Sequence, residues 1–541
     1  MNKILIILLL SITVILQGCS SDNETNVSHG TKHQVLHLGN GDEPQDIDPH
    51  VVTGVPEHHI IIALVEGLVN KDPVDLSPEP GVAKSWEISA DGKTYVFHLR
   101  DDAKWSNGEP VTALDFIYSW KRALMPALGN QYAYMLYPVK GAEQFHKGKI
   151  SDFSDVGMTA LDAHTLEVRL ENSTPYFLGL LDHYSTFPVH QATVEKFGEI
   201  DSRGTQWTRP GNFVGNGPFV LKQWKLNKII IVEKNPLYWD ADTVKLKAIH
   251  FHPIQHTATE ERLFRTGQLH VTNSLPEEKI AVYKENKPGL IKIYPYLGTY
   301  FYRFNTTKPP LNDVRVRMAL AMTIDRNKIV EKVTKGGQIP AYTLTPPDTL
   351  GYTANASIPF DIERAKNLLN EAGYLDGEGF PKIQLLYNTS EGHRKIALAI
   401  QQMWKLALNV DIELYNQDWK VFLDSQRTMN FEMTRASWIG DYVDPNTFLD
   451  MFITDGGNNN TGWSNQRYDE LISLAAQTSD QEQRYKIFQQ AEEILMEAVP
   501  IIPIYTYTRN FLISPDVKGW HQNILDHHPY KYVVLEASES Q

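Results

Sequence analysis

Cysteine is almost absent from this sequence, which has a single one, Cys19, in 541 residues. No intramolecular disulfide can form, so the fold has to be stabilised by a large apolar core. The length is sufficient for such a core and suggests two or three lobes.

Catalytic signatures are missing as well. The sequence has no Gly-x-x-x-x-Gly-Lys-Ser/Thr phosphate loop, no Gly-x-Ser-x-Gly and no His-Glu-x-x-His. Because Cys19 falls in an N-terminal export segment, a cysteine nucleophile is excluded too. These absences weaken the enzyme hypothesis without removing it, and we expect no cofactor.

Basic runs and further apolar runs are also lacking. The net charge is −14 without a cluster of lysine and arginine, and an acidic chain is a poor partner for nucleic acid. After the N-terminal segment, no apolar stretch approaches the roughly 20 residues that cross a bilayer. We therefore expect no nucleic-acid binding and no membrane-spanning helix.

The N-terminus carries an export signal. Lys3 precedes an apolar run from Ile4 to Leu16, a pattern that predicts a secretory signal peptide over residues 1–18. The sequence before Cys19 resembles the processing site of bacterial lipoproteins, in which the cysteine is lipidated, although Gln17 stands where a small residue is usual. The alternative is a plain cleaved signal. Residues 19–31 are polar, so we expect a flexible tether.

Strand and helix patterns alternate along the rest of the chain, which predicts the α/β or the α+β class. Residues 94–100 and 410–414 alternate apolar and polar side chains, as half-buried strands do. Helix starts are expected at Thr112, with Asp115 three residues on, and at Asp361. A long amphipathic helix is expected over residues 480–497.

Histidines provide the nearest approach to a metal site. His250 and His252 share one face of a predicted strand, and His256 follows, but Pro253 interrupts the run and no acidic ligand lies close. We interpret these, and the adjacent pair His527 and His528, as ordinary strand-edge histidines. No metal site is predicted.

Asp441 lies in the segment Ser-Trp-Ile-Gly-Asp-Tyr-Val-Asp-Pro that begins at residue 437. Turn chemistry alone can explain a carboxylate there, since Gly440 and Pro445 favour turns. The alternative is a carboxylate aimed at a cationic ligand group. Spacing alone favours the turn, and Arg435 and His393 are by themselves compatible with surface positions.

Longer motifs resolve this choice through a resemblance. The segments Ala-Lys-Ser-Trp-Glu at 83–87, Asp-Gly-Lys-Thr-Tyr-Val-Phe-His-Leu-Arg at 91–100 and Ala-Lys-Trp-Ser-Asn-Gly-Glu-Pro-Val-Thr-Ala at 103–113 resemble the signature of the peptide- and nickel-binding class of bacterial solute-binding proteins. The segments at 47–50, 54–57, 385–390 and 440–442 narrow the resemblance to the oligopeptide-binding proteins of oligopeptide permeases. It extends from about Val35 to the C-terminus.

The resemblance implies a type II periplasmic-binding-protein fold of three lobes, with the ligand cleft between lobes I and III. Lobe I would comprise residues 32–55, 191–290 and 509–541, lobe II residues 56–190, and lobe III residues 291–508. Hinges are expected near Tyr294–Gly298 and Tyr505–Arg509. The ligand would be a short peptide held as an extended strand.

Site residues follow from the same resemblance. Asp441 would pair with the peptide ammonium, and Arg435 and His393 with its carboxylate. Main-chain partners would come from the segments around Glu43 and Gln45 and around Ser437, Trp438 and Ile439. Pocket contacts would come from Tyr132, Asn273, Tyr296, Asn388, Trp419 and Tyr507, although each aromatic is also compatible with core packing.

Three features depart from the family pattern. Ala321 stands where relatives have a lysine for the peptide carboxylate, Gly298 and Ile439 where they have a bridging cysteine pair, and Pro44 removes one main-chain donor. The changes at Ala321 and Pro44 leave open a paralogue for murein peptides, dipeptides or a signalling peptide. A periplasmic hydrolase or chaperone is the alternative of another class, and a nickel or haem carrier is less favoured.

The implied role is that of a monomeric receptor which delivers peptides to the membrane permease subunits of an ABC transporter. It would act in the periplasm or at the outer face of the cell membrane, tethered by lipid on Cys19.

Overall fold

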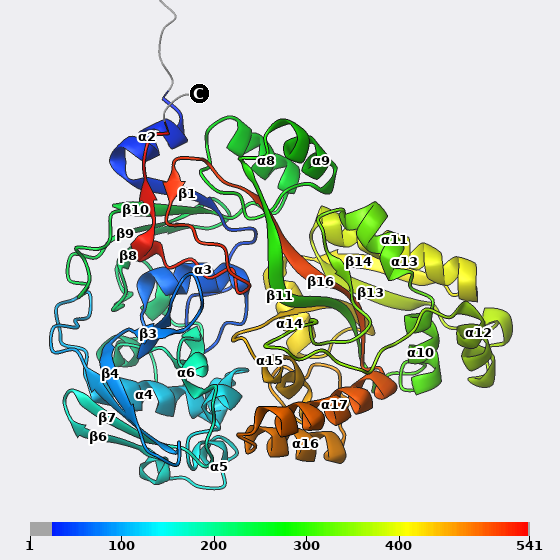
Figure 1. Cartoon of the computed structure of the whole chain (residues 1–541), viewed down its shortest axis with the longest axis horizontal. Helices are drawn as coiled ribbons and strands as arrows, with labels where there is room; N and C mark the ends of the chain where they lie inside the picture. The colour runs from blue at the N-terminus through cyan, green and yellow to red at the C-terminus, as the bar shows by residue number, and fades with distance from the viewer. Residues whose placement is uncertain (1–23, 539–541) are drawn as a thin grey trace, which may run out of the picture.

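Three sheets of four or more strands organise the part of the chain that the computed structural model describes, residues 24–538. In Figure 1 the first sheet lies beneath α2, the second lies at the lower left, and the third occupies the right-hand half. The N-terminal signal peptide predicted over 1–18 and the predicted lipidation at Cys19 lie outside the described residues.

The first sheet has the order β1-β10-β9-β8. Only β1 and β10 are parallel, and the other pairs are antiparallel. Its strands come from two distant parts of the chain: β1 (Val35–Gly39), β8 (Phe219–Lys225), β9 (Ile229–Lys234) and β10 (Ala248–His252). The contact between β1 and β10 therefore closes a loop of about two hundred residues that contains the second sheet.

The second sheet is fully antiparallel, with the order β4-β5-β7-β6. Its strands are β4 (Ala83–Ile88), β5 (Thr94–Leu99), β6 (Met158–Asp162) and β7 (Thr165–Arg169). As predicted, β5 alternates, and Tyr95, Phe97 and Leu99 are buried. Helix α4 (Ala113–Leu124) packs near this sheet, and the Thr112 main-chain N–H donates to Asp115 Oδ2 at 2.7 Å, which confirms the predicted helix start.

The third sheet has six strands in the order β12-β16-β11-β15-β13-β14. They are β11 (Ile291–Phe304), β12 (Ile339–Pro340), β13 (Ile383–Asn388), β14 (Ile412–Gln417), β15 (Met433–Ile439) and β16 (Ile501–Leu512). Helices α13 (Glu391–Leu408) and α14 (Trp419–Arg427) pack on β13 and β14. Small two-stranded sheets pair β2 (Val69–Lys71) with β3 (Pro78–Pro80), and β17 (Val517–Lys518) with β18 (Val534–Leu535).

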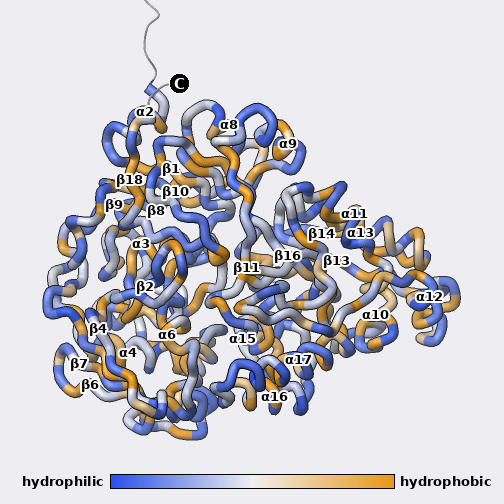
Figure 2. The backbone as a smooth tube through the Cα atoms, in the orientation of Figure 1, coloured by the Kyte–Doolittle hydropathy of each residue, from blue (hydrophilic) through white to orange (hydrophobic). Residues whose placement is uncertain are grey.

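The remaining helices surround these sheets, and hydrophilic segments trace the outer loops in Figure 2. The predicted starts at Asp361 and Asp480 are confirmed, because each carboxylate accepts a hydrogen bond from the third residue beyond it. The helices are α2 (Asn26–His33), α3 (Val55–Leu64), α5 (Ala142–His146), α6 (Phe177–Leu180), α7 (Gln191–Lys196), α8 (Thr257–Arg265), α9 (Glu277–Asn286), α10 (Val314–Met322), α11 (Arg326–Lys328), α12 (Ile362–Glu371), α15 (Asn446–Leu449), α16 (Gln466–Ala476) and α17 (Gln481–Ala498).

Strands β11 and β16 run together from the region of α8 and α9 into the six-stranded sheet (Figure 1). They pair from Ile291 to Pro295 and again from Thr299 to Arg303, with a shift of register between the two stretches. The predicted hinge near Tyr294–Gly298 coincides with this interruption. The lobe boundaries and the hinges themselves stay predictions.

Two predictions about local structure were wrong. The tether does not extend to residue 31, because α2 begins at Asn26 and Thr31 Oγ1 donates to Asp516 Oδ2 at 2.8 Å. Composition alone predicted disorder, but tertiary contacts stabilise this short helix. His250 and His252 are not on a strand edge, since β10 lies between β1 and β9.

The ion pair between Asp48 and Arg122 gives a first prediction, because both side chains are buried and joined at 2.6 Å. Asp48→Asn leaves the guanidinium without its counter-charge, and we expect the free energy of unfolding to fall by about 3–5 kcal/mol. Urea denaturation followed by circular dichroism measures this.

The matched control for this prediction is Asp101→Asn, which removes an exposed carboxylate 3.8 Å from Lys84. It should change stability by no more than about 0.5 kcal/mol. Equal effects for the two variants would contradict a special contribution of the buried pair.

Candidate functional site

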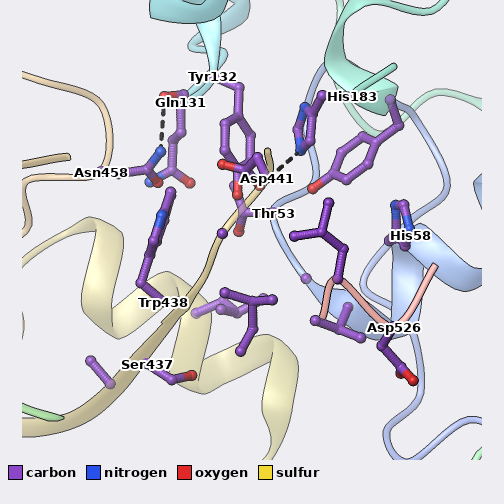
Figure 3. A pocket seen from close by; sticks show the side chains of 18 of the residues that line it. Thr53, His58, Gln131, Tyr132, His183, Ser437, Trp438, Asp441, Asn458 and Asp526 are labelled. Atoms are coloured by element: carbon purple, nitrogen blue, oxygen red, sulfur yellow. Dashed lines mark hydrogen bonds and ion pairs between the residues drawn. The ribbon is translucent and has the colours of Figure 1, made fainter. Parts of the chain in front are cut away.

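A cavity lies between the six-stranded sheet and segments from the first half of the chain (Figure 3). It contains about 1280 Å³ of space not occupied by protein atoms, part of it open to solvent. Its wall is formed by residues 53–55, 58–59, 71, 131–132 and 182–184 on one side, and by residues from β11, α14 and β15 with the loops after them on the other. Residues 525–527 complete the wall.

The edge of β15 forms one side of this cavity. β11 pairs with β15 along its whole length, from Gly298 opposite Ile439 to Phe304 opposite Met433. On the other side, β13 reaches only Met433 and Thr434. Residues 435–439 therefore present a strand edge to the cavity, and such an edge can accept an extended chain as an added strand.

Asp441 lies at one end of this edge, just beyond β15. Figure 3 shows its carboxylate between Tyr132 and His183, and His183 Nε2 lies 3.4 Å from Asp441 Oδ1. Burial raises the pKa of Asp441 to about 7. Burial also lowers the pKa of His183 well below its usual range, so that ring is neutral at pH 7.

Lys71 does not neutralise Asp441. Its ammonium lies 2.9 Å from Asp182 Oδ2 and donates at 3.0 Å to the main-chain oxygen of Asp441. The Lys71 charge is thus balanced by Asp182, and the Asp441 carboxylate stays buried without a full counter-charge. This arrangement suits a ligand that brings its own cation.

Arg435 marks the other end of the edge. Its Nη2 donates to Tyr507 Oη at 2.8 Å, and its Nη1 lies 3.4 Å from Asn388 Oδ1. The guanidinium also lies 4.9 Å from the ring of Tyr300, and His393 Nδ1 lies 3.5 Å from the Tyr300 hydroxyl. Within residues 24–538 no carboxylate forms an ion pair with Arg435, so this end suits an anionic group.

The structure brings together most of the predicted ligand-binding residues. Those in the cavity wall are Asp441, Arg435, Ser437, Trp438, Ile439, Tyr132, Tyr296 and Trp419. Asn388, His393 and Tyr507 stand behind the wall, around Arg435 and Tyr300.

Glu43, Gln45 and Asn273 lie outside the wall. The Glu43 carboxylate accepts from Trp224 Nε1 at 2.6 Å, and the Gln45 main-chain N–H donates to Glu57 Oε1 at 2.7 Å. Because Pro44 has no N–H and that of Gln45 is already bonded, neither residue offers a free main-chain N–H to a ligand. Asn273 lines a separate, smaller cavity.

The two remaining departures from the family pattern have structural counterparts. Ala321 is fully buried in α10, within the apolar core. Gly298 pairs with Ile439, and a Cβ at Gly298 would lie 2.4 Å from Ile439 Cδ1. The glycine thus makes room for the isoleucine side chain that forms part of the cavity wall.

Sequence reasoning missed several polar groups in the cavity. They are Lys71, Asp182, His183, Arg303, Gln426, Asn458 and His527, and they come from loops and strands far apart in the chain. No local motif marks them, and His527 had been interpreted as a strand-edge histidine, although it lines the cavity and is buried. In the described part of the chain, no group of three or more histidine, cysteine, aspartate or glutamate side chains is placed to hold a metal ion.

Comparison with known proteins gives a consistent result. Residues 77–460 match the model of the bacterial extracellular solute-binding proteins, family 5. The periplasmic oligopeptide-binding protein OppA of Escherichia coli is 41% identical over 496 residues, which cover 90% of each chain.

Solved structures add information about shape. The murein tripeptide binding protein MppA of E. coli is 40% identical with a TM-score of 0.89, and the alignment covers 94% of this chain and 99% of that one. Haemophilus influenzae OppA in complex with the peptide RPPGFSPFR is 36% identical with a TM-score of 0.88, at the same coverage. The unliganded open form of MppA gives only 0.63, over 93% of this chain and 98% of that one. The present arrangement is therefore closer to that of the peptide complex than to the open form, and the predicted resemblance and fold class are confirmed.

Proposed function

Because the chain belongs to family 5 of the bacterial extracellular solute-binding proteins, we propose that it captures short peptides as the substrate-binding component of an ABC-type importer. The E. coli and H. influenzae relatives are named as oligopeptide-binding proteins. Family members are binding proteins, which accords with the lack of catalytic motifs in this sequence.

The observation that carries this proposal is the pair of opposite charges along one strand edge. A peptide in water is a zwitterion, and here a buried carboxylate at Asp441 and a buried guanidinium at Arg435 flank the free edge of β15. The peptide would add to this edge, with its ammonium at Asp441 and its carboxylate toward Arg435. The main chain from Arg435 to Asp441 spans at most roughly 20 Å, which limits a peptide that joins both groups to about six residues.

Closure on the ligand is part of the proposal. Several contacts cross the cavity, including Trp419 Nε1 to Glu57 Oε1 at 3.4 Å and Gln131 Nε2 to the main-chain oxygen of Gly457 at 2.9 Å. Both contacts join predicted lobe II to predicted lobe III. Lobe III would separate from lobes I and II by bending at Tyr294–Gly298 and Tyr505–Arg509, and would close when a peptide contacts both sides.

The cellular setting follows from the relatives and from the N-terminus. OppA of E. coli is described as periplasmic, and across residues 24–538 every helix is too short or too polar to traverse a bilayer. The protein would act as a monomer outside the cytoplasm, held to a membrane by lipid on Cys19. It would pass its peptide to the permease subunits of the transporter.

A second ligand class has a specific argument in its favour. MppA, named as a murein tripeptide binding protein, is as similar to this chain as the oligopeptide-binding relatives are. Murein peptides carry the same free ammonium, so Asp441 would serve them equally. Contacts to the side chains of the ligand, rather than to its ammonium and carboxylate, would determine whether the site prefers murein peptides or other oligopeptides.

N-terminal acetylation gives the first test of the proposed binding mode. Acetylation removes the positive charge that Asp441 is proposed to pair with, and we expect acetylated tri-alanine to bind at least about 100-fold more weakly than tri-alanine. Isothermal titration calorimetry measures both affinities. In Asp441→Asn the two peptides should bind with similar, low affinity.

Asp411→Asn is the matched control, because it removes an exposed carboxylate that pairs with Lys405, away from the cavity. This variant should keep the wild-type preference for the free ammonium. An unchanged affinity for acetylated tri-alanine in the wild-type protein would refute the role of Asp441.

The raised pKa of Asp441 also predicts a pH dependence. Below pH about 7 the carboxyl becomes protonated and neutral, so peptide affinity should fall as the pH is lowered, by up to roughly tenfold per unit. Above about pH 8 affinity should fall again, because the peptide amine loses its proton. Titrations between about pH 5 and 9 give this profile, and Asp441→Asn should lack its acidic limb. A flat profile below pH 7 in the wild-type protein would show that Asp441 is not the partner.

A further inference from the structure

Arg303 is a buried cation in the cavity wall to which the proposed binding mode gives no role. Its side chain belongs to β11 and only 3% of its surface is exposed. The guanidinium donates two long hydrogen bonds of 3.4 Å, one to Gln426 Oε1 and one to the main-chain oxygen of Asn458. Its Nε has no hydrogen-bond partner in the described structure. A buried guanidinium without a counter-charge is costly, so it calls for an anionic ligand group.

The surroundings of Arg303 contain amides rather than carboxylates. Gln426, Asn458, Asn460 and Gln131 line the same cavity. Burial alone accounts for the lowered pKa of Arg303, about 10, and no neighbouring carboxylate contributes to it. The carboxylates elsewhere in the wall have other partners or another proposed role: Asp182 pairs with Lys71, Asp526 pairs with Arg509, and Asp441 faces the ammonium end.

Strand register places Arg303 and Arg435 on opposite faces of the sheet. Arg303 is opposite Thr434, whereas Arg435 is opposite Tyr302. Side chains at directly opposed positions point to the same face and alternate along each strand. The side chain of Arg303 therefore lies on the same face of the sheet as that of Trp438. The side chain of Arg435 lies on the opposite face, with those of Ser437 and Ile439.

A peptide added to β15 would alternate in the same way. With its ammonium at Asp441 it runs antiparallel to β15, so its first residue lies beside Ile439, its second beside Trp438 and its third beside Ser437. Of the first three side chains, only the second enters the face that holds Arg303, and a fourth, beside Ala436, would enter it as well. Asn458, which contacts Arg303, is also hydrogen-bonded to Gln131, and Figure 3 shows both amides beside the Trp438 ring.

We propose that Arg303 binds a carboxylate in the side chain of the second residue of the bound peptide, so that the preferred ligands are short peptides with an acidic second residue. This inference rests on the proposed function. Gln426 and Asn458 hold the guanidinium in place through their oxygen atoms. The guanidinium can then donate charge-assisted hydrogen bonds to the ligand carboxylate. The third side chain of the peptide lies on the other face of the sheet, so its binding does not depend on Arg303.

Calorimetry with matched tetrapeptides tests the proposal. The wild-type protein should bind Ala-Glu-Ala-Ala about tenfold or more tightly than Ala-Gln-Ala-Ala, since charge-assisted hydrogen bonds are strong in a buried site. In Arg303→Gln this ratio should fall to about one, and Arg303→Lys should keep part of it. The ratio between Ala-Ala-Glu-Ala and Ala-Ala-Gln-Ala should be the same in the wild-type protein and in Arg303→Gln.

The outcomes separate this inference from the proposed function. Tetra-alanine that binds to the wild-type protein without any preference for glutamate at the second position would overturn the role of Arg303 alone. Failure of all the peptides to bind would overturn peptide capture as well. A preference that persists in Arg303→Gln would assign it to another residue, and thermal unfolding of both variants verifies that they are folded.

Discussion

The pairing of β11 with β16 is the constraint on which the geometry of the cleft depends. These two strands join the region of α8 and α9 to the six-stranded sheet, and their ladder is interrupted between Pro295 and Thr299. At the interruption the Leu297 N–H donates to the Ile524 main-chain oxygen, and the Leu297 oxygen accepts from Gly440 N–H. Leu297, at the interruption, is thus hydrogen-bonded to segments on both sides of the cavity. It also places Asp441 next to the point where the two strands can bend.

Unpaired buried charges explain why such a cleft would close on a ligand. Arg435 and Arg303 are buried and Asp441 is largely buried, and none of them has an ion-pair partner that fully neutralises it among the described residues. In the proposed open form these groups would regain water, whereas in the closed form only a ligand could compensate them. A peptide would therefore stabilise the closed form over the open one through charges that it alone supplies.

Local sequence patterns predicted local structure well. They failed where contacts between distant parts of the chain determine the structure. The alternation in β5 and the capping residues Thr112, Asp361 and Asp480 specify their elements through neighbours within a few residues. The tether was misjudged because Thr31 is held by Asp516, almost five hundred residues away. The cavity residues Arg303 and His183 carried no local signal either, since their roles arise from strand register and loop packing. Asp441 and Arg435 could be identified only because a family resemblance supplied the contacts that spacing does not encode.

Main-chain pairing and side-chain recognition make different demands on this site. Hydrogen bonds along the edge of β15 would be indifferent to ligand sequence, so they would set affinity rather than preference. By the family resemblance the carboxylate end would have one cation fewer, because the short, buried side chain of Ala321 carries no charge. His393 does not replace it, since burial, with a smaller effect from Arg435, lowers its pKa well below the usual range and leaves the ring neutral. Arg435 is then the one charged group of the three matching positions. Peptide length would accordingly be selected by the distance from Asp441 to Arg435, while Arg303, on the other face, selects for charge in the interior of the peptide.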